Sequence, residues 1–351
     1  MTYQSPVQAN DFHPDTQAYF AGACVAVTGG SGFVGSHVVE QLLALGARVI
    51  VPSRQAPSPP FLAHLSDRID VRPCDFQHRS HAKPSIDGAD VVMNLAASVA
   101  GIEYNATHPE TVFRDNMRTF LNVMEAALQV QARRFLVVSS ACIYPRHCLV
   151  PTPETEGFAD SPEPTNAGYG WAKRMEEYVA AAAVKEHGLE VAIARPYNAY
   201  GPRDNFNPVS SHVLPALILK ADETTDGTLP VWGDGTPTRS FLYVDDFARG
   251  LIEVTARYAA ADPINIGASE EVSIGTVAAM VAEIVGRRRG TAITPTFMPT
   301  SLTGQPRRDC DTTKLVSALG FQPNVGLREG LERSVSWFLE NRELALIAHH
   351  Q

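Results

Sequence analysis

The chain has 351 residues, of which 44% are hydrophobic and 19% are charged, and its formal net charge is -9. Because single cores stop growing at roughly 250–300 residues, this length predicts one large domain with a smaller appended lobe. The acidic balance excludes the basic surface that binds nucleic acid, and no run of about 18 apolar residues is present, so we expect no nucleic-acid and no membrane partner.

The chain begins with a polar segment, residues 1–20, which we expect to be a tail outside the main domain. It lacks the basic residues and the apolar run of a secretory signal, so we expect a cytoplasmic protein. The five cysteines of the chain are odd in number and show no CxxC spacing. This pattern favours reduced thiols over a disulfide framework, and we expect no metal site.

From residue 24 onward, short apolar runs alternate with helical patterns. The runs typical of buried strands are residues 24–28, 48–52, 90–97, 134–140 and 190–196. Segment 33–45, between the first two runs, carries Val and Leu at helical spacing. This alternation predicts an α/β fold, a Rossmann-type doubly wound parallel sheet. After residue 196, Gly-, Pro- and Asn-rich connections follow, and a helix near 327–340 closes the chain.

A glycine-rich stretch, VTGGSGFVGSH, follows the first strand and opens a helix, with Gly29, Gly32 and Gly35 in GxxGxxG spacing. Glycines allow a tight turn and a close backbone approach, so a pyrophosphate can bind at the helix N-terminus. The alternative is a tight turn with no ligand. Because the stretch follows an apolar strand in a βαβ pattern, we interpret it as a dinucleotide-binding loop.

The end of the second strand indicates which dinucleotide is bound. An acidic residue there would accept hydrogen bonds from the ribose 2'-OH of NAD, but the chain has Ser53 and Arg54, which suit a 2'-phosphate. We therefore favour NADP(H), with NAD(H) as the alternative if Arg54 is only a solvated charge. Asp75, after another strand, is placed to bind the adenine amine or to cap a turn.

We expect a division into a Rossmann domain and a substrate lobe. The NADP-binding Rossmann domain comprises residues 21–195 and about 240–267. The smaller, mixed α/β C-terminal lobe comprises residues 196–239 and 268–345.

The stretch YGWAK places Tyr169 and Lys173 four residues apart, so that both side chains lie on one face of a helix. A lysine cation beside a phenol favours the phenolate and makes Tyr169 a better acid/base for a carbonyl oxygen. The spacing alone is common by chance. Here, however, it follows a glycine loop, an NLAA strand and a serine-terminated strand in that order.

Together these features resemble the extended short-chain dehydrogenase/reductases, the NAD-dependent epimerase/dehydratase family, from Cys24 to about Asn341. In that family the Tyr and Lys act with a Ser or Thr on the preceding strand, here Ser140. The resemblance implies further cofactor contacts from Phe33, Val34, Phe76, Leu95, Ala96, Ala97, Asn116, Ser139, Pro196, Asn198 and Ala199.

Later stretches, among them EPTNAGYGWAK and VWGDGTPTRSFLYVDD, look like the GDP-L-fucose synthase branch of this family. SSACIYP and NIGASEEVSI also resemble GDP-mannose 3,5-epimerase. Both relatives invert carbons beside a C4 ketone and use a cysteine as one acid/base group. Inversion needs a base on one face and an acid on the other, and a thiol with a pKa of about 8.5 serves either role. The resemblance therefore implies a catalytic role for Cys142.

The second acid/base group separates the two branches. His212 occupies the position that serves this role in GDP-L-fucose synthase, whereas the epimerase uses a lysine. The nearest lysine, Lys220, lies eight residues further on, in a position suited to a phosphate or sugar. This difference favours the synthase branch.

The resemblance also implies how a sugar nucleotide is bound. Arg239 and Arg308 match diphosphate-binding positions, with Arg307 as an alternative to Arg308, while Trp232 and Lys220 are further contacts. Asn198 and His212 are expected to approach the sugar.

We therefore expect an NADP(H)-dependent GDP-sugar 3,5-epimerase/4-reductase. The alternatives are an epimerase that does not consume its cofactor and, from another class, a non-catalytic dinucleotide-binding protein. We also expect a homodimer, because helical segments 111–129 and 169–186 are rich in small residues that permit close packing between subunits; ordinary burial against the sheet is the alternative.

Overall fold

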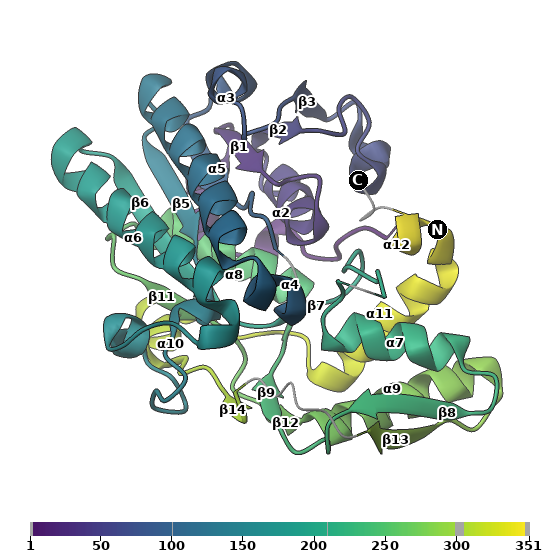
Figure 1. Ribbon diagram of the computed structural model, residues 1–351. Coiled ribbons are helices and arrows are strands. Elements are labelled where there is room, and N and C mark those ends of the chain that lie inside the picture. Colours follow the sequence, from purple (N-terminus) through teal and green to yellow (C-terminus); the bar gives the residue numbers. More distant parts are fainter. Residues whose placement is uncertain (1–2, 100, 209, 299–304, 348–351) are drawn as a thin grey trace.

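A seven-stranded parallel sheet forms the centre of the protein (Figure 1), which we describe from a computed structural model over residues 3–99, 101–208, 210–298 and 305–347. The strand order is β11-β6-β5-β4-β1-β2-β3. The strands are β1 (Cys24–Thr28), β2 (Arg48–Ser53), β3 (Ile69–Pro73), β4 (Val91–Asn94), β5 (Arg134–Val138), β6 (Glu190–Pro196) and β11 (Ile264–Ile266). This order, with crossover helices on both faces, confirms the expected doubly wound fold.

Alternation of side chains along the strands divides the large domain into two apolar layers. Val25 and Val27 of β1 face helices α2 (Phe33–Ala44) and α8 (Val244–Arg257). Ala26, between them, faces the opposite layer. The helices of that opposite layer are α3 (Arg79–Ile86), α5 (Pro109–Gln129) and α6 (Ala167–His187). Both faces of the sheet are therefore covered, which explains why its strands are nearly continuous apolar runs.

The smaller lobe has its own apolar core beside the carboxyl ends of the strands. Its helices are α7 (Val213–Glu223), α9 (Ile274–Arg289), α11 (Leu327–Glu340) and α12 (Arg342–Ile347). Its strands form three small sheets. The first pairs β7 (Ala199–Tyr200) with β10 (Leu242–Tyr243), and the second pairs β8 (Thr228–Trp232) with β13 (Thr294–Met298). In the third, β9 (Thr238–Ser240) lies between β12 (Glu271–Ser273) and β14 (Arg307–Arg308). Helices α4 (Ile102–Thr107) and α10 (Thr313–Leu319) lie in connections.

Two segments differ from the sequence-based expectation. The expected polar tail is folded onto the large domain from residue 3: α1 (Pro14–Phe20) packs against α8, and Tyr3 and Ser5 donate hydrogen bonds to Asp245. At the other end, α12 follows the helix that was expected to close the chain. Residues 1–2 of the tail and 299–304 of the expected lobe lie outside the described residues. No helix in the described ranges is long and apolar enough to cross a membrane.

Candidate active site

A cleft of about 1760 Å³ lies between the carboxyl ends of the strands and the smaller lobe. Pockets for one small ligand usually measure about 300–1,000 Å³. The volume therefore suits two ligands side by side. Crevices at this edge of a parallel sheet are where doubly wound proteins bind dinucleotides.

The glycine loop forms one wall of this cleft, and its packing requires glycine. A side chain at Gly35 would place a Cβ 2.1 Å from the carbonyl oxygen of Gly29, which itself has φ of +69°. Gly32 precedes α2, and Phe33 and Val34 form its first turn. The free N–H groups of this first turn border the cleft, which suits the pyrophosphate of a dinucleotide.

Most of the expected cofactor residues border the same cleft. Ser53 donates a hydrogen bond to Ser31 at 3.1 Å, and Arg54 is exposed at the rim. Asp75 accepts a hydrogen bond from the Gln77 N–H at 2.9 Å, so it does cap a turn while it faces the cleft. The other expected residues at the cleft are Phe76, Leu95, Ala96, Ala97, Ser139, Pro196, Asn198 and Ala199.

Asn116 is the exception among the expected cofactor residues. Its side chain is buried and is not among the described residues that border the cleft. Its amide accepts from the Ser98 N–H at 2.9 Å and donates to the carbonyls of Ser98 and Val112. Asn116 therefore holds the loop after β4 in place, and its expected direct contact with the cofactor stays a prediction.

Tyr169 and Lys173 lie one turn apart on α6, as the spacing predicts. The Lys173 ammonium is 5.5 Å from the centroid of the Tyr169 ring. Burial nevertheless raises the pKa of Tyr169 to about 12, because it outweighs the lowering effect of Lys173. Lys173 therefore acts in the expected direction, toward the phenolate, but burial has the larger effect and favours the neutral phenol of Tyr169.

Cys142 lies in the short helix η3 (Ala141–Ile143), directly after β5. Ser140 caps this helix by accepting a hydrogen bond from the Cys142 N–H at 3.1 Å. A Cβ at Gly170 would lie 2.6 Å from the Cys142 carbonyl oxygen, so the glycine lets α6 approach the cysteine closely. The Arg308 guanidinium donates to the Cys142 sulfur at 3.5 Å and places a positive charge beside it.

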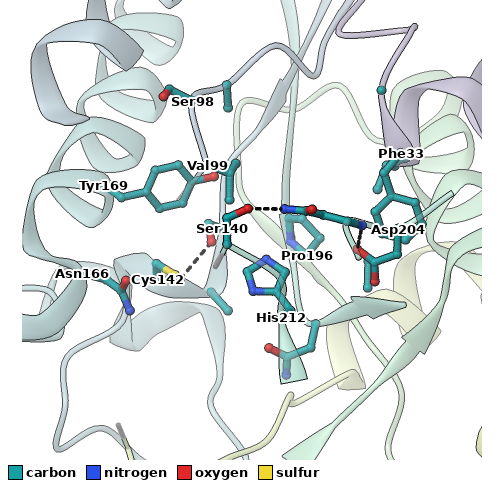
Figure 2. A pocket seen from close by; sticks show the side chains of 18 of the residues that line it. Phe33, Ser98, Val99, Ser140, Cys142, Asn166, Tyr169, Pro196, Asp204 and His212 are labelled. Carbon is teal, nitrogen blue, oxygen red and sulfur yellow. Dashed lines mark hydrogen bonds between the residues drawn. The ribbon is translucent and has the colours of Figure 1, made fainter. Parts of the chain in front are cut away.

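His212 reaches the cleft from the start of α7, in the other lobe. Figure 2 shows its ring and the Cys142 sulfur on either side of the space in front of Ser140. His212 is exposed to solvent in the cleft. The walls of the cleft, and then Arg308, lower the pKa of His212, which favours the neutral imidazole, the form that can accept a proton.

Two arginines face the cleft from neighbouring strands. Arg239 on β9 pairs in register with Arg308 on β14. Burial, followed by the charge of Arg308, lowers the pKa of Arg239 to about 10. Two cations held this close create a site for an anion. The alternative, Arg307, points elsewhere and pairs with Glu271 at 2.7 Å.

Trp232 borders the cleft with 73% of its surface exposed. The Lys220 ammonium lies 4.6 Å from the centroid of the indole ring. Lys220 itself is not among the described residues that border the cleft. Lys220 therefore contacts Trp232, and its expected contact with a phosphate or sugar stays a prediction.

Sequence reasoning missed several polar residues of the cleft, above all Asp204. Its carboxyl is 2% exposed. One oxygen accepts from the Asn205 N–H at 2.7 Å, and the other has no hydrogen-bond partner among the residues that the structure describes. Burial raises its pKa to about 8. Glu163 and Gln305 also face the cleft. In the sequence, the signal for Asp204 and Glu163 was their position in the proline-containing stretches PRDNFNP and EPTN, respectively.

A parallel sheet that ends in a glycine loop, with a tyrosine and a lysine beside the same cleft, defines a dinucleotide-dependent enzyme of the short-chain dehydrogenase/reductase class. The sequence supports this class independently. The model of the NAD dependent epimerase/dehydratase family matches residues 25–267, and the chain belongs to this family. The resemblance noted from the sequence is thereby confirmed.

Individual relatives are similar over most of the chain. GDP-L-fucose synthase 1 of Arabidopsis thaliana is 35% identical over 322 residues, which cover 91% of this chain and 94% of that protein. Among solved structures, the epimerase Mth375 of Methanothermobacter thermautotrophicus has a TM-score of 0.83 at 28% identity and covers 95% of this chain and 98% of its own. A GDP-L-fucose synthetase of Naegleria fowleri bound to NADP has a TM-score of 0.75 at 25% identity, with coverages of 92% and 94%.

Proposed function

We propose that this enzyme is an NADP(H)-dependent nucleotide-sugar 3,5-epimerase/4-reductase that acts on a GDP-4-keto-6-deoxy sugar. The observation that carries the proposal is the placement of Cys142 and His212 on two sides of one space, with Ser140 and Tyr169 beside it. Relatives named GDP-L-fucose synthase support the choice of a GDP-sugar.

The proposed epimerisation uses the two acid/base groups in turn. A ketone at C4 acidifies the protons at C3 and C5, because the resulting enolate is delocalised onto oxygen. One of Cys142 and His212 removes a proton, and the other returns one to the opposite face. Ser140 and Tyr169 hold the C4 oxygen by hydrogen bonds and stabilise its negative charge. Arg308 holds positive charge beside the sulfur.

The proposed reduction needs an acid and a nicotinamide cofactor. NADPH, when bound at the glycine loop, supplies the hydride for C4. Tyr169 donates the proton to the C4 oxygen, in keeping with its neutral phenol. Lys173, buried beside it, orients the nicotinamide ribose. Arg239 and Arg308 bind the diphosphate of the sugar nucleotide, and Trp232 offers a flat face to its base or sugar.

We test this function by cofactor stoichiometry. Purified enzyme with GDP-4-keto-6-deoxy-mannose is expected to oxidise one NADPH per product and to leave GDP-mannose unchanged. Cys142→Ser is expected to abolish solvent-deuterium exchange at C3 and C5 while NADPH affinity stays the same, because a hydroxyl is a far weaker acid than a thiol. Conversion of GDP-mannose to its 3,5-epimers without absorbance change at 340 nm would instead establish the epimerase alternative.

We further propose that Arg54 selects the 2'-phosphate of NADP(H), since it stands at the cleft rim directly after β2. Arg54→Glu is expected to weaken NADPH binding about tenfold, roughly 1.4 kcal/mol, with little change for NADH. The side chain is exposed, so solvent screening keeps the effect modest. Arg48→Glu, an exposed arginine at the start of the same strand, is the matched control. Equal weakening of both cofactors by Arg54→Glu would contradict this role.

A further inference from the structure

Three side chains of α6 that face the sheet form one row. Tyr169, Lys173 and Glu176 are spaced by four and three residues, so they share a face of the helix. The Lys173 ammonium donates to the Glu176 carboxylate at 2.9 Å and to the Val138 carbonyl at 3.0 Å. The side chains of Lys173 and Glu176 are only 3% and 2% exposed. Sequence reasoning assigned no role to Glu176.

Glu176 is the counter-ion of Lys173 in this buried site. The neighbouring Glu177 is already bound to Arg195 on β6, at 2.8 and 2.9 Å, and to the Ser139 hydroxyl. The charged residues of α5, which packs against α6, are not among the buried ones. Although burial by itself would lower the pKa of Lys173, Glu176 raises it, so the two side chains form an ion pair.

This ion pair changes what the lysine does to the tyrosine. A lone ammonium next to a phenol favours the phenolate, and a carboxylate 2.9 Å from the ammonium opposes that effect. Among the groups around Tyr169, burial raises its pKa most and Lys173 lowers it next. Cys142 and Glu176 raise the pKa, and the Ser140 hydroxyl lowers it. Arg308 lies beyond Cys142 and binds its sulfur.

We propose that Glu176 is a positioning residue that favours the acid form of Tyr169, the form that reduction needs, because its carboxylate pairs with Lys173 and weakens the pull of the ammonium on the phenol. This proposal rests on the proposed function. In reduction the C4 carbonyl carbon accepts hydride from NADPH, which leaves as NADP+. The carbonyl oxygen accepts the proton of the Tyr169 hydroxyl, which then regains a proton from water. An enzyme that begins by oxidising C4–OH needs the opposite, a phenolate base.

The first measurement uses the protein without substrate or cofactor. The ionisation of Tyr169 is followed by NMR of tyrosine labelled with 13C at Cζ, and its signal is assigned by loss in Tyr169→Phe. Wild type is expected to keep a neutral Tyr169 at about pH 10, the ordinary pKa of tyrosine. Glu176→Gln, which keeps the size and a hydrogen bond to Lys173 but removes the charge, is expected to ionise about one pH unit or more below wild type.

Two further variants make the comparison specific. Glu176→Asp keeps the negative charge but moves it one methylene away from Lys173. The Tyr169 titration of this variant should therefore lie closer to wild type than that of Glu176→Gln. Asp246→Asn is the matched control, because Asp246 forms another buried pair at helical spacing, with Arg249 on α8 at 2.8 Å. It should leave the Tyr169 titration unchanged. If Glu176→Gln does not fold, Glu176→Asp alone must show a smaller downward shift.

The second measurement is the pH dependence of NADPH-linked reduction. Because the acid form of Tyr169 is needed, activity is lost as pH rises through its pKa, and the basic limb of Glu176→Gln should lie about one pH unit or more below that of wild type. An unchanged titration and an unchanged limb would overturn the role of Glu176. A wild-type enzyme that consumes no NADPH with the keto-sugar would overturn the proposed function instead, and the NMR titration still decides whether Glu176 controls Tyr169.

Discussion

Burial controls the charge of single side chains in this cleft more than their nearest neighbours do. Tyr169 is a neutral phenol in spite of Lys173 beside it. Asp204 is raised to a pKa of about 8 because its carboxyl is buried and only the Asn205 N–H opposes that effect. His212 is shifted the other way, toward the neutral imidazole, by the same cause. These shifts favour the neutral forms of Tyr169, Asp204 and His212.

Asp204 gives a stability prediction whose sign follows from its raised pKa. The neutral carboxyl makes its full contribution to the stability of the folded protein below the unfolded pKa of about 3.9. This contribution is lost as the pH rises through the folded pKa of about 8. Asp204→Asn is therefore expected to equal wild type at about pH 4 and to exceed it at about pH 9, by a free energy of unfolding on the order of a few kcal/mol. Urea unfolding at both pH values measures this. Asp67→Asn, on an exposed turn, removes the same charge as a control, and a pH-independent difference for Asp204→Asn would refute the prediction.

At the scale of elements, α5 and α6 pack against each other on one face of the sheet, side by side in Figure 1. The alanine-rich stretch of α6 suggested a dimer interface. Two of its residues, Ala180 and Ala183, instead pack in the apolar core between α6 and the sheet. The outer surfaces of the two helices instead expose large apolar side chains: Phe113, Leu121, Trp171 and Tyr178. An exposed apolar surface of this kind favours association.

We propose that these helices form the interface of a homodimer. Light scattering at micromolar concentration is expected to give the mass of a dimer. Leu121→Glu, which places a charge on the outer face of α5, is expected to give a monomer. Val316→Glu, at a similarly exposed apolar residue on α10, is the matched control and should remain dimeric. A monomeric wild type would exclude the proposal.

At the scale of the whole molecule, the cleft exists because two lobes meet at the carboxyl ends of the strands. Cys142 comes from the end of β5, whereas His212, Arg239 and Arg308 come from the smaller lobe. The folded N-terminal segment contacts a residue next to the cleft. Arg203, which precedes Asp204, donates hydrogen bonds to the Tyr3 carbonyl and to the Glu40 carboxylate on α2. The site therefore depends on how lobes pack, and not on one motif.

Most strands of the sheet, the glycine loop and the YxxxK helix were predictable from the sequence, because each follows a local pattern of residues. The strand β11 was not predicted. Apolar runs end where β1 and β6 end, and the GxxGxxG spacing marks the start of α2. The motifs also indicated Cys142 and His212 through family resemblance. Such patterns act over a few residues, so they determine elements and their order well.

Contacts between distant segments and the charge of buried groups were decided only by the tertiary structure. No sequence pattern places Arg308 on the sulfur of Cys142, turns Arg307 to Glu271, or makes Asn116 a support for Ser98. These contacts depend on the packing of whole elements, and the pKa of Tyr169 depends on how much water that packing removes. The sequence by itself determined the sheet, the loop and the candidate acid/base residues. The folded structure determined which of them meet and which carry protons, because desolvation and distance exist only after folding.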